Sequence, residues 1–433
     1  MSKIPNISVR RTPDFFGGER VKGEVFCQIN NNTLMENPVF IAGLGAISAI
    51  GKNVAECLDS LENGKAGMGH MHYFDSLHRD KLPVAEVKLS NDDLAKISGL
   101  PVTKSRTAQL SLIAAREALE DAGIENITSL RTGFISANSV GGMDKSEKFF
   151  VEFLSDNKKG KLRGVVNHEC GSISELVADQ LGIRDYITTI STACSSSANA
   201  IFFGARMIKN NMLDVVVAGG TDALTKFTLN GFNTLMILDE KFCQPFDENR
   251  RGLNLGEGAG YIVLVSEKVA ASLKKKPVAV LSGYCNANDA YHQTASSPDG
   301  NGSFLAMSGA LKKAGLQPSD IDYINLHGTG TQNNDIAEGT AIKRLFDPHY
   351  PKMSSTKAFT GHTLGACGGI EAVFSVLSLQ QGIIYPNLRL ETAMHDLPFS
   401  VEKIFTKNIS VKHVLSNSFG FGGNCSSLIF SKV

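Results

Sequence analysis

The run of residues 213–218 is almost wholly apolar and leads directly into Gly219 and Gly220, which constrains the fold more than any other stretch. A strand with so few polar side chains is buried on both faces, as in parallel sheets that lie between layers of helices. Comparable strands are predicted at 39–42, 131–137, 186–190, 261–265, 278–284, 321–326, 411–417 and 427–430. Helices are predicted between them at 53–62, 104–122, 172–181, 302–314, 335–346 and 372–380. This alternation predicts one layered α/β unit made of two lobes.

The best internal boundary is the stretch Lys274 to Pro277, because three lysines and a proline are typical of a solvated turn. Residues 1–37 have no clear periodicity and form an arm that precedes the first predicted strand. We therefore predict three parts, which are an N-terminal arm over 1–37, an N-terminal lobe over 38–276 and a C-terminal lobe over 277–433.

The charge and cysteine content exclude several classes of protein. The 433 residues include 43 basic and 43 acidic side chains, and this zero formal net charge argues against a nucleic-acid partner. The eight cysteines form no Cys-x-x-Cys pair, which argues against a zinc module or a disulfide framework and favours a reducing compartment. No apolar run reaches the roughly 20 residues that a membrane-spanning helix needs. We predict a cytoplasmic protein that binds no metal and no membrane.

The segment from Thr189 to Ala200 has the pattern of a strand, a tight turn and a helix, with Cys194 in the turn. The apolar spacing of Ile201, Ala205 and Ile208 is that of a helix. At a helix start, unpaired N–H groups and the helix dipole favour a thiolate, so a cysteine there is a better nucleophile than a free one. Cysteine is also among the most buried residue types, so the spacing alone leaves a purely structural role open.

Three polar loops follow predicted strands of the second lobe, at the ends where open α/β sheets place their ligands. They are residues 326–331, 355–362 and 418–424. Their histidines can donate hydrogen bonds to a developing oxyanion or enolate, and their threonines offer hydroxyls to a polar substrate arm. A histidine after a strand is more often a structural group, so no single loop is decisive. Together with a cysteine that can hold an acyl group as a thioester, they indicate acyl-transfer chemistry.

Four motifs then occur in order. They are Thr192-Ala193-Cys194-Ser195-Ser196, His327-Gly328-Thr329-Gly330-Thr331, the segment from Lys357 to His362 continuing to Gly365 and Glu371, and Gly420-Phe421-Gly422-Gly423. With these motifs the chain resembles the β-ketoacyl-acyl carrier protein synthases, condensing enzymes of the thiolase superfamily, and most closely the type II elongating synthases. The resemblance runs from about Val39 to Phe430. It implies a thiolase-like, five-layered α-β-α-β-α fold made of two related lobes.

The resemblance also implies a decarboxylative Claisen condensation of an acyl thioester with a malonyl thioester. Cys194 would be the nucleophile that takes the acyl chain, and His327 and His362 would promote decarboxylation of the malonyl group and stabilise the enolate. The histidines would be supported by Lys357, Asp335, Glu338 and Glu371. The N–H groups of Cys194 and Phe421 would form the oxyanion hole, and Phe421 would also be the gate. Thr329 and Thr331 would bind the phosphopantetheine arm, and Val140 would line the acyl pocket. Because loss of carbon dioxide generates the carbanion, the resemblance implies no cofactor beyond the phosphopantetheine of the carrier.

Three residues depart from the pattern of the family. Arg251 stands where an aspartate is usual, and Asn424 and Cys425 stand where Thr and then Asn are common. Since the altered loop adjoins the gate, a synthase of polyene or polyketide chains is an alternative to one of ordinary fatty acids.

Other functions remain as alternatives. A non-condensing partner subunit of the chain-length-factor type is disfavoured because such subunits typically lack the nucleophile. A degradative thiolase needs a second catalytic cysteine, and neither Cys367 nor Cys425 lies in the required motif. A Cys-His hydrolase would give no reason for Lys357.

The resemblance implies an acyl carrier protein as partner, and a homodimer or a heterodimer with a related subunit in which each chain completes the other's acyl pocket. An acidic carrier would dock on a local basic surface. Lys104 and Arg106 at the start of a predicted helix are candidates for that surface, and Arg206 and Lys209 are weaker ones. Ordinary solvated charge is the alternative reading of each of these residues.

Overall fold

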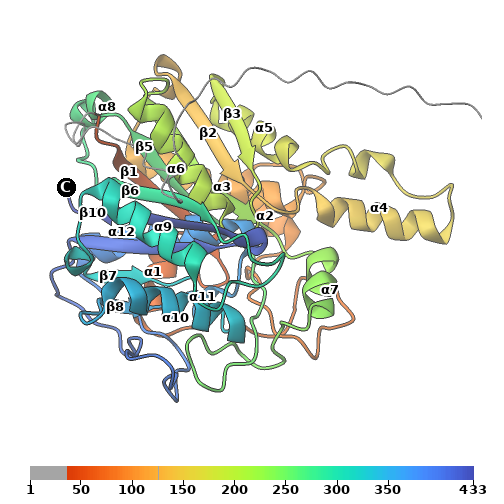
Figure 1. Ribbon diagram of the computed structural model, residues 1–433. Helices are drawn as coiled ribbons and strands as arrows, with labels where there is room; N and C mark the ends of the chain where they lie inside the picture. Colours follow the sequence, from red (N-terminus) through yellow and green to blue (C-terminus); the bar gives the residue numbers. More distant parts are fainter. Residues whose placement is uncertain (1–36, 125) are drawn as a thin grey trace, which may run out of the picture. The chain divides into compact units, whose positions relative to one another are not determined.

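The computed structural model describes residues 37–124 and 126–433, so all but the last residue of the predicted arm lies outside the described residues. The described strands form one mixed sheet in the order β3-β2-β4-β5-β1-β6-β10-β9-β7-β8 (Figure 1). Their bounds are β1 (Phe40–Ser48), β2 (Thr132–Ala137), β3 (Tyr186–Ile190), β4 (Val215–Asp222), β5 (Gly258–Val265), β6 (Ala279–Asn288), β7 (Tyr323–Asn325), β8 (Lys352–Ser354), β9 (His413–Phe419) and β10 (Asn424–Ser431).

The sheet consists of two halves with the same internal order. In the first half β2 lies parallel to β3 and β4, and β5 pairs antiparallel with β4 and β1. The second half repeats this arrangement, because β7 lies parallel to β8 and β9, and β10 pairs antiparallel with β9 and β6. A short antiparallel contact joins the halves, with Phe40 opposite Val280. The prediction of two related lobes is thereby confirmed.

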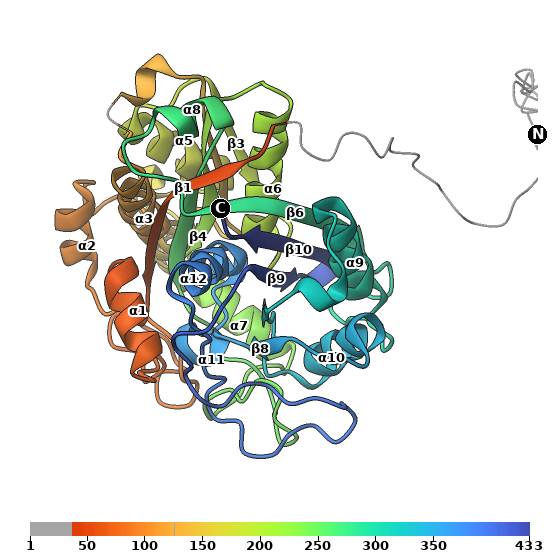
Figure 2. The same cartoon turned by 90° about the vertical axis from the view of Figure 1, so that its left-hand side faces the viewer.

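Helices cover both halves of the sheet. Their bounds are α1 (Val54–Glu62), α2 (Asn91–Ser98), α3 (Arg106–Ala122), α4 (Met143–Ser155), α5 (Cys170–Leu181), α6 (Ser196–Lys209), α7 (Lys226–Thr234), α8 (Glu267–Ser272), α9 (Asn301–Ala314), α10 (Gln332–Phe346), α11 (Lys357–Thr360) and α12 (Cys367–Gln381). Helices α3 and α5 lie on the outer face of the first half, α9 on that of the second half with α10 beside it, and α6 and α12 between the halves (Figure 2). These are the five layers that the sequence predicted.

The central helices fit between the two halves because α12 carries small residues where it meets its neighbours. All of its residues from Cys367 to Leu379 are buried. A side chain at Gly369 would place its Cβ 2.3 Å from the carbonyl oxygen of Gly260, and one at Gly368 would lie 2.9 Å from the backbone nitrogen of Ala198. The close approach brings the beginnings of α6 and α12 together, and both beginnings adjoin the candidate site.

Several predicted helix ends coincide with polar caps. The side chain of Asn53 accepts from the N–H of Glu56 at the start of α1, and Ser105 accepts from Ala108 at the start of α3. Gly123 ends α3 in the left-handed conformation at φ 64°. In the described ranges, no helix is both long enough and apolar enough to cross a membrane.

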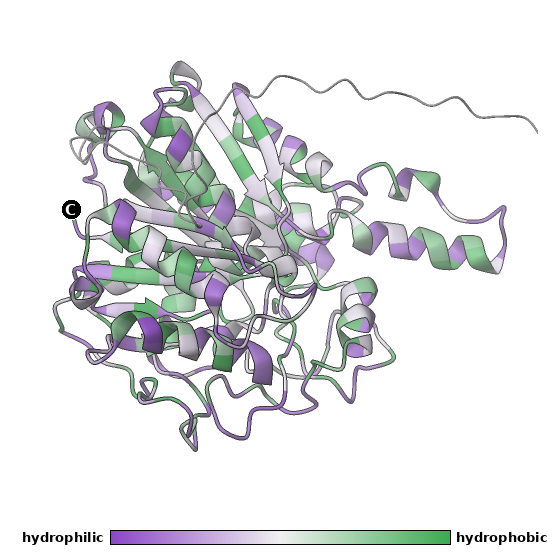
Figure 3. Cartoon of the chain, viewed as in Figure 1, coloured by the Kyte–Doolittle hydropathy of each residue, from purple (hydrophilic) through white to green (hydrophobic). Residues whose placement is uncertain are grey.

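Helix α4 was not predicted, and its apolar side chains do not face the core. None of its residues is buried. Figure 3 shows that apolar segments nevertheless alternate with polar ones along this helix. It therefore presents apolar surface to the outside of the chain.

Candidate active site

Cys194 lies in a tight turn between β3 and α6, as the sequence predicted. The preceding residue, Ala193, adopts the left-handed conformation at φ 53°. The turn is held by its own hydroxyls, since Ser196 Oγ accepts from the N–H of Thr192 at 2.7 Å and Ser195 Oγ lies 2.8 Å from the Thr192 carbonyl oxygen. The cysteine is only 5% exposed. Its sulfur therefore has a fixed position at the base of a cavity.

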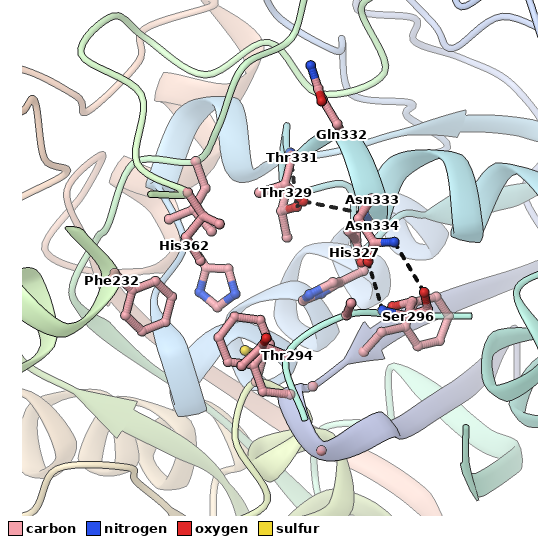
Figure 4. Close-up of a pocket in the computed structure, with 18 of the residues that line it drawn as sticks. Phe232, Thr294, Ser296, His327, Thr329, Thr331, Gln332, Asn333, Asn334 and His362 are labelled. Carbon is pink, nitrogen blue, oxygen red and sulfur yellow. Dashed lines mark hydrogen bonds between the residues drawn. The ribbon is translucent and has the colours of Figure 1, made fainter. Parts of the chain in front are cut away.

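The cavity has a volume of about 340 Å³ and draws residues from both lobes (Figure 4). Its lining brings together Cys194, His327, His362, Thr329, Thr331 and Phe421 of the predicted site. The Cys194 sulfur and one ring nitrogen of each histidine lie within 4.8 Å of one another. The two imidazole rings are nearly perpendicular, with centroids 5.6 Å apart.

The loop that carries His327 is fixed by carboxylates of α10. Glu338 accepts from the N–H groups of His327 at 3.0 Å and Gly328 at 2.8 Å. Asp335 accepts from the N–H groups of Thr329 at 3.0 Å and Gly330 at 3.2 Å. Burial raises the pKa of Glu338 to about 7, although the hydrogen bonds from the His327 and Gly328 N–H groups oppose the rise. Asp335 and Glu338 thus hold the backbone of the loop rather than the imidazole ring itself.

The ring of His327 is oriented by a buried ion pair. Lys357 Nζ lies 3.1 Å from His327 Nδ1 and 2.5 Å from Glu371 Oε1. Burial opposes the charge on Lys357, but Glu371 together with Cys367 and Glu338 outweighs this penalty, and the pKa of the lysine is raised. Burial, followed by the charge of Lys357, holds the pKa of His327 well below its usual value. Since an ammonium group can only donate, the neutral ring accepts at Nδ1 and carries its proton on Nε2.

The tautomer of His362 is set in a similar way. Its Nδ1 accepts from the backbone N–H of Leu364 at 3.1 Å, and the thiol of Cys367 lies 3.5 Å from the same atom. The remaining nitrogen, Nε2, therefore carries the proton. Both histidines can consequently donate an N–H to a negatively charged oxygen beside Cys194.

The loop after β9 approaches the cysteine turn very closely. A Cβ at Gly420 would lie 3.1 Å from the backbone nitrogen of Cys194 and 2.9 Å from the Thr192 carbonyl oxygen, so only glycine fits there without strain. The next residue, Phe421, lines the cavity and stacks on Phe232 with ring centroids 5.8 Å apart. The predicted gate residue thus lies beside the nucleophile.

The two predicted threonines lie together on the cavity wall. Their hydroxyl oxygens are 2.9 Å apart. Thr331 also caps α10, because its hydroxyl accepts from the N–H of Asn334 at 3.4 Å. Its hydroxyl therefore has a structural partner as well as access to the cavity.

The prediction that Arg106 helps to dock a carrier protein is wrong. Its side chain is 9% exposed, and its guanidinium lies 2.7 Å from Glu257. It also donates to the carbonyls of Val87 and Leu89, each at 3.0 Å. The residue thus ties α3 to the core. Lys104 lies in the turn before α3 and is partly exposed.

Three further residues of the prediction, Val140, Arg206 and Lys209, do not line the described cavity. Val140 is buried, does not line the described cavity, and donates its N–H to Asp222 at 3.3 Å. Arg206 and Lys209 lie in the last turn of α6, roughly 20 Å along the helix from Cys194. They are at the end of α6 opposite the cavity.

Several cavity residues were not identified as site residues from the sequence. They are Phe232, Met236, Ile237, Leu253, Thr294 to Ser296 and Gln332 to Asn334. Arg251 also lines the cavity and pairs with Asp239, and its departure from the family pattern was the one signal in the sequence. Of the others, Phe232 lies in α7 and Gln332 to Asn334 begin α10, and the rest come from loops that carry no recognisable motif.

Known proteins give the family of the chain. The family model described as "Beta-ketoacyl synthase, N-terminal domain" matches residues 36–270, and "Beta-ketoacyl synthase, C-terminal domain" matches 278–391. A relative named 3-oxoacyl-[acyl-carrier-protein] synthase 2 from Staphylococcus aureus (strain N315) is 32% identical over 91% of this chain and 98% of its own length. A protein of the same name from Coxiella burnetii is 33% identical with the same coverage.

Solved structures agree with this assignment. One described as "The ishigamide ketosynthase/chain length factor" is 28% identical, with a TM-score of 0.87 over 92% of this chain and 100% of the other. Another, of a type II PKS acyl-carrier protein in complex with its ketosynthase, is 26% identical, with a TM-score of 0.83 over the same shares. The chain therefore belongs to the β-ketoacyl synthase family and is a condensing acyltransferase.

Proposed function

We propose that the chain condenses an acyl group held on Cys194 with a malonyl group, and that an acyl carrier protein delivers both on its phosphopantetheine. The observation that carries this proposal is the meeting of the Cys194 sulfur with two imidazole nitrogens within 4.8 Å. The tautomers of both rings supply N–H donors rather than proton acceptors toward the sulfur. Such an arrangement suits a reaction in which negative charge develops on a thioester oxygen.

In the first half-reaction, the Cys194 thiolate attacks the acyl thioester carbonyl. The oxygen of the resulting tetrahedral intermediate accepts from the N–H groups of Cys194 and Phe421. Collapse of the intermediate breaks the bond to the carrier sulfur, which leaves as a thiol after taking up a proton. The acyl group remains on the cysteine as a thioester.

In the second half-reaction, a malonyl thioester binds with its carbonyl oxygen at the Nε2–H groups of His327 and His362. Its carbon–carboxylate bond breaks, carbon dioxide leaves, and the electron pair is held as an enolate whose oxygen these donors stabilise. The enolate carbon then attacks the acyl-cysteine carbonyl and expels the sulfur as a thiolate. The product is a 3-oxoacyl thioester two carbons longer.

We further propose that no metal acts in this site, although a cysteine and two histidines are common zinc ligands. Lys357 can only donate to His327 Nδ1, so the Nε2 of that neutral ring carries a proton and has no free lone pair for a metal. The backbone N–H of Leu364 has the same effect on His362.

The alternative of a degradative thiolase is disfavoured by the surroundings of its candidate second cysteine. Cys367 is 2% exposed, does not line the described cavity, and burial raises its pKa to about 12. The alternative of a non-condensing subunit is disfavoured because Cys194, His327 and Lys357 are all present. A ring nitrogen of His327 lies within 4.8 Å of the Cys194 sulfur, and Lys357 contacts the same ring. Arg251 and Asn424, which depart from the usual pattern at the cavity and beside its gate, favour polyene or polyketide elongation over that of ordinary fatty acids.

The carrier would approach the mouth of the cavity, where Met236 is 88% exposed and the Arg251 side chain 51%. Thr329 and Thr331 on the cavity wall would hold the phosphopantetheine arm. Docking at Lys104, lining of the acyl pocket by Val140 and a cytoplasmic location remain predictions. So does the division at residues 276 and 277, which is supported by the gap between the two family matches at 270 and 278.

We also propose that the chain forms a dimer through β3 and α4. Strand β3 is at one end of the sheet and leaves one edge unpaired within the chain. Exposed apolar side chains gather nearby in the sequence at Phe150, Val151, Phe153, Leu154, Leu162, Val166 and Ile187. So much exposed apolar surface is typical of an interface.

Replacing Phe150 and Leu154 together by glutamate is therefore expected to convert the dimer to a monomer. Both side chains are more than half exposed, so the fold of the single chain should tolerate the change. Sedimentation velocity measures the result, with Leu77→Glu as the matched control because Leu77 is fully exposed and lies outside α4. A wild-type chain that stays monomeric would contradict the proposal. A wild-type chain that pairs only with a related chain would indicate a heterodimer instead.

The proposed function predicts a covalent acyl adduct. The wild-type chain, incubated with acyl-carrier thioesters of several lengths, should gain one acyl mass on Cys194 in intact-protein and peptide mass spectrometry. Addition of malonyl-carrier should discharge the adduct with release of carbon dioxide and a 3-oxoacyl-carrier. Discharge to the free acid by water alone would indicate a hydrolase and contradict the proposal.

A further inference from the structure

A cluster of side-chain amides and hydroxyls joins the cysteine turn to the loop that carries the gate. We define the asparagine cluster as Ser195, Asn199, Asn286, Asn424 and Ser426. The side-chain oxygen of Asn424 accepts from Ser195 Oγ at 2.7 Å, Asn199 Nδ2 at 2.9 Å and Asn286 Nδ2 at 2.7 Å. These donors come from the start of α6 and from β6, so one oxygen connects three elements.

The donors of the cluster are themselves fixed. Asn199 Nδ2 also donates to Thr192 Oγ1 at 2.8 Å, within the cysteine turn. The Asn199 oxygen accepts from Ser426 Oγ at 2.5 Å and from Asn286 Nδ2 at 3.1 Å. Ser195 and Ser426 are fully buried, and Asn199 is 6% exposed. The hydrogen bonds among these three residues are thus shielded from water, which strengthens them, whereas Asn286 is exposed.

The backbone of Asn424 closes the gate loop at the same point. Its carbonyl accepts from the N–H of Gly420 at 2.8 Å, so residues 420–424 form a tight loop with Phe421 at its tip. Gly420 is also the residue whose backbone approaches the Cys194 nitrogen. The side chain of Asn424 therefore binds the turn that carries Cys194, and its main chain binds the loop that carries Phe421.

We propose that Asn424 is a positioning residue that holds the Phe421 N–H in register with the Cys194 N–H. This inference rests on the proposed function, in which these two groups stabilise the tetrahedral intermediate. Such donors must lie about 2.7–3.1 Å from the oxyanion, so a shift of roughly 0.5 Å between the two loops weakens the stabilisation. The amide oxygen suits this position because it carries no hydrogen and can only accept.

Asn424→Ala is expected to slow acylation of Cys194 by an acyl thioester by roughly 10- to 100-fold, less than the loss of an oxyanion donor itself. The same variant should react with iodoacetamide at Cys194 within about twofold of wild type, because alkylation at a saturated carbon forms no oxyanion. In steady-state assays kcat should fall while KM for the acyl-carrier stays close to wild type, since Asn424 does not line the described cavity. A variant that is merely misfolded would lose both reactions together.

Two further variants complete the test. Asn288 is a matched control, because its side chain donates to the Gly422 carbonyl of the same loop at 3.0 Å and accepts from the N–H of Ala290 at 2.7 Å rather than from the cysteine turn. Asn288→Ala should leave both rates within roughly threefold of wild type. Asn424→Thr retains an acceptor oxygen and should restore most of the acylation rate.

Three results would overturn the inference: normal acylation in Asn424→Ala, equal losses of acylation and alkylation, or the same loss in Asn288→Ala. Failure of the proposed function would look different, because the wild-type chain would then form no acyl adduct at all.

Discussion

The variant Cys194→Ala is expected to form no acyl adduct and to lose carbon–carbon bond formation by roughly 10⁴-fold or more. The physical reason is that the methyl group offers no lone pair to the acyl carbonyl, so the covalent intermediate that divides the reaction into two steps cannot form. Decarboxylation of malonyl-carrier should continue at a measurable rate, because the N–H donors of His327 and His362 do not depend on the sulfur. Bond formation and carbon dioxide release would thereby become uncoupled.

The matched control is Cys367→Ala. Its sulfur lies 3.5 Å from His362 Nδ1 but does not line the described cavity. This variant should take up one acyl group as the wild type does. Intact-protein mass spectrometry detects the adduct, and labelled carbon dioxide reports decarboxylation. Persistence of an adduct in Cys194→Ala, or its loss in Cys367→Ala, would mean that Cys194 is not the nucleophile.

The residues that share the reaction centre were predictable because each belongs to a motif that fixes its local backbone. A strand, small residues and a helix place Cys194 at a turn, and the His-Gly-Thr-Gly-Thr motif places His327 at the end of β7. The layered fold was predictable for a related reason, since continuous apolar strands such as β4 must be covered on both faces.

The sequence could not predict contacts that depend on distant partners. Arg106 has the appearance of a surface cation at a helix start, and only Glu257, far along the chain, makes it a buried one. Phe232 enters the cavity from α7 and Thr294 from a loop, and neither belongs to a recognisable motif. Helix α4 was missed although its apolar residues recur at helical spacing, and none of its residues is buried in the chain.

Asn424 illustrates a third kind of limit. Its departure from the family pattern was visible in the sequence, but the meaning of the change was not. The structure supplies three donors from α6 and β6 to its side-chain oxygen. Only their convergence gives the substitution a physical interpretation.

The second large effect is expected for Lys357→Met, which removes the positive member of a fully buried pair. Glu371 would be left as an uncompensated charge, and breaking such a pair costs about 3–5 kcal/mol in the free energy of unfolding. His327 would also lose the donor that fixes its tautomer, and wrong-tautomer variants of other enzymes lose up to about 10⁴-fold in kcat. We therefore expect both stability and condensing activity to fall steeply.

The double variant Lys357→Met, Glu371→Leu separates these two effects. Since it removes both charges, unfolding in urea should show most of the stability restored, while condensation stays low because Nδ1 of His327 still lacks its donor. Recovery of activity together with stability would contradict the orienting role of Lys357 and leave the ion pair as a purely structural feature.

The pH profile gives an independent measurement of the same contact. In the wild type, burial and the charge of Lys357 hold the pKa of His327 well below its usual value, so the ring stays neutral into mild acid. Removal of that charge raises the pKa of His327 toward its unperturbed value, and protonation then converts the ring to a cation at higher pH. The ratio of variant to wild-type kcat, measured between pH 8 and pH 5.5, should therefore change as the pH falls. A ratio that does not change with pH would mean that Lys357 has no electrostatic influence on His327, whatever its effect on folding.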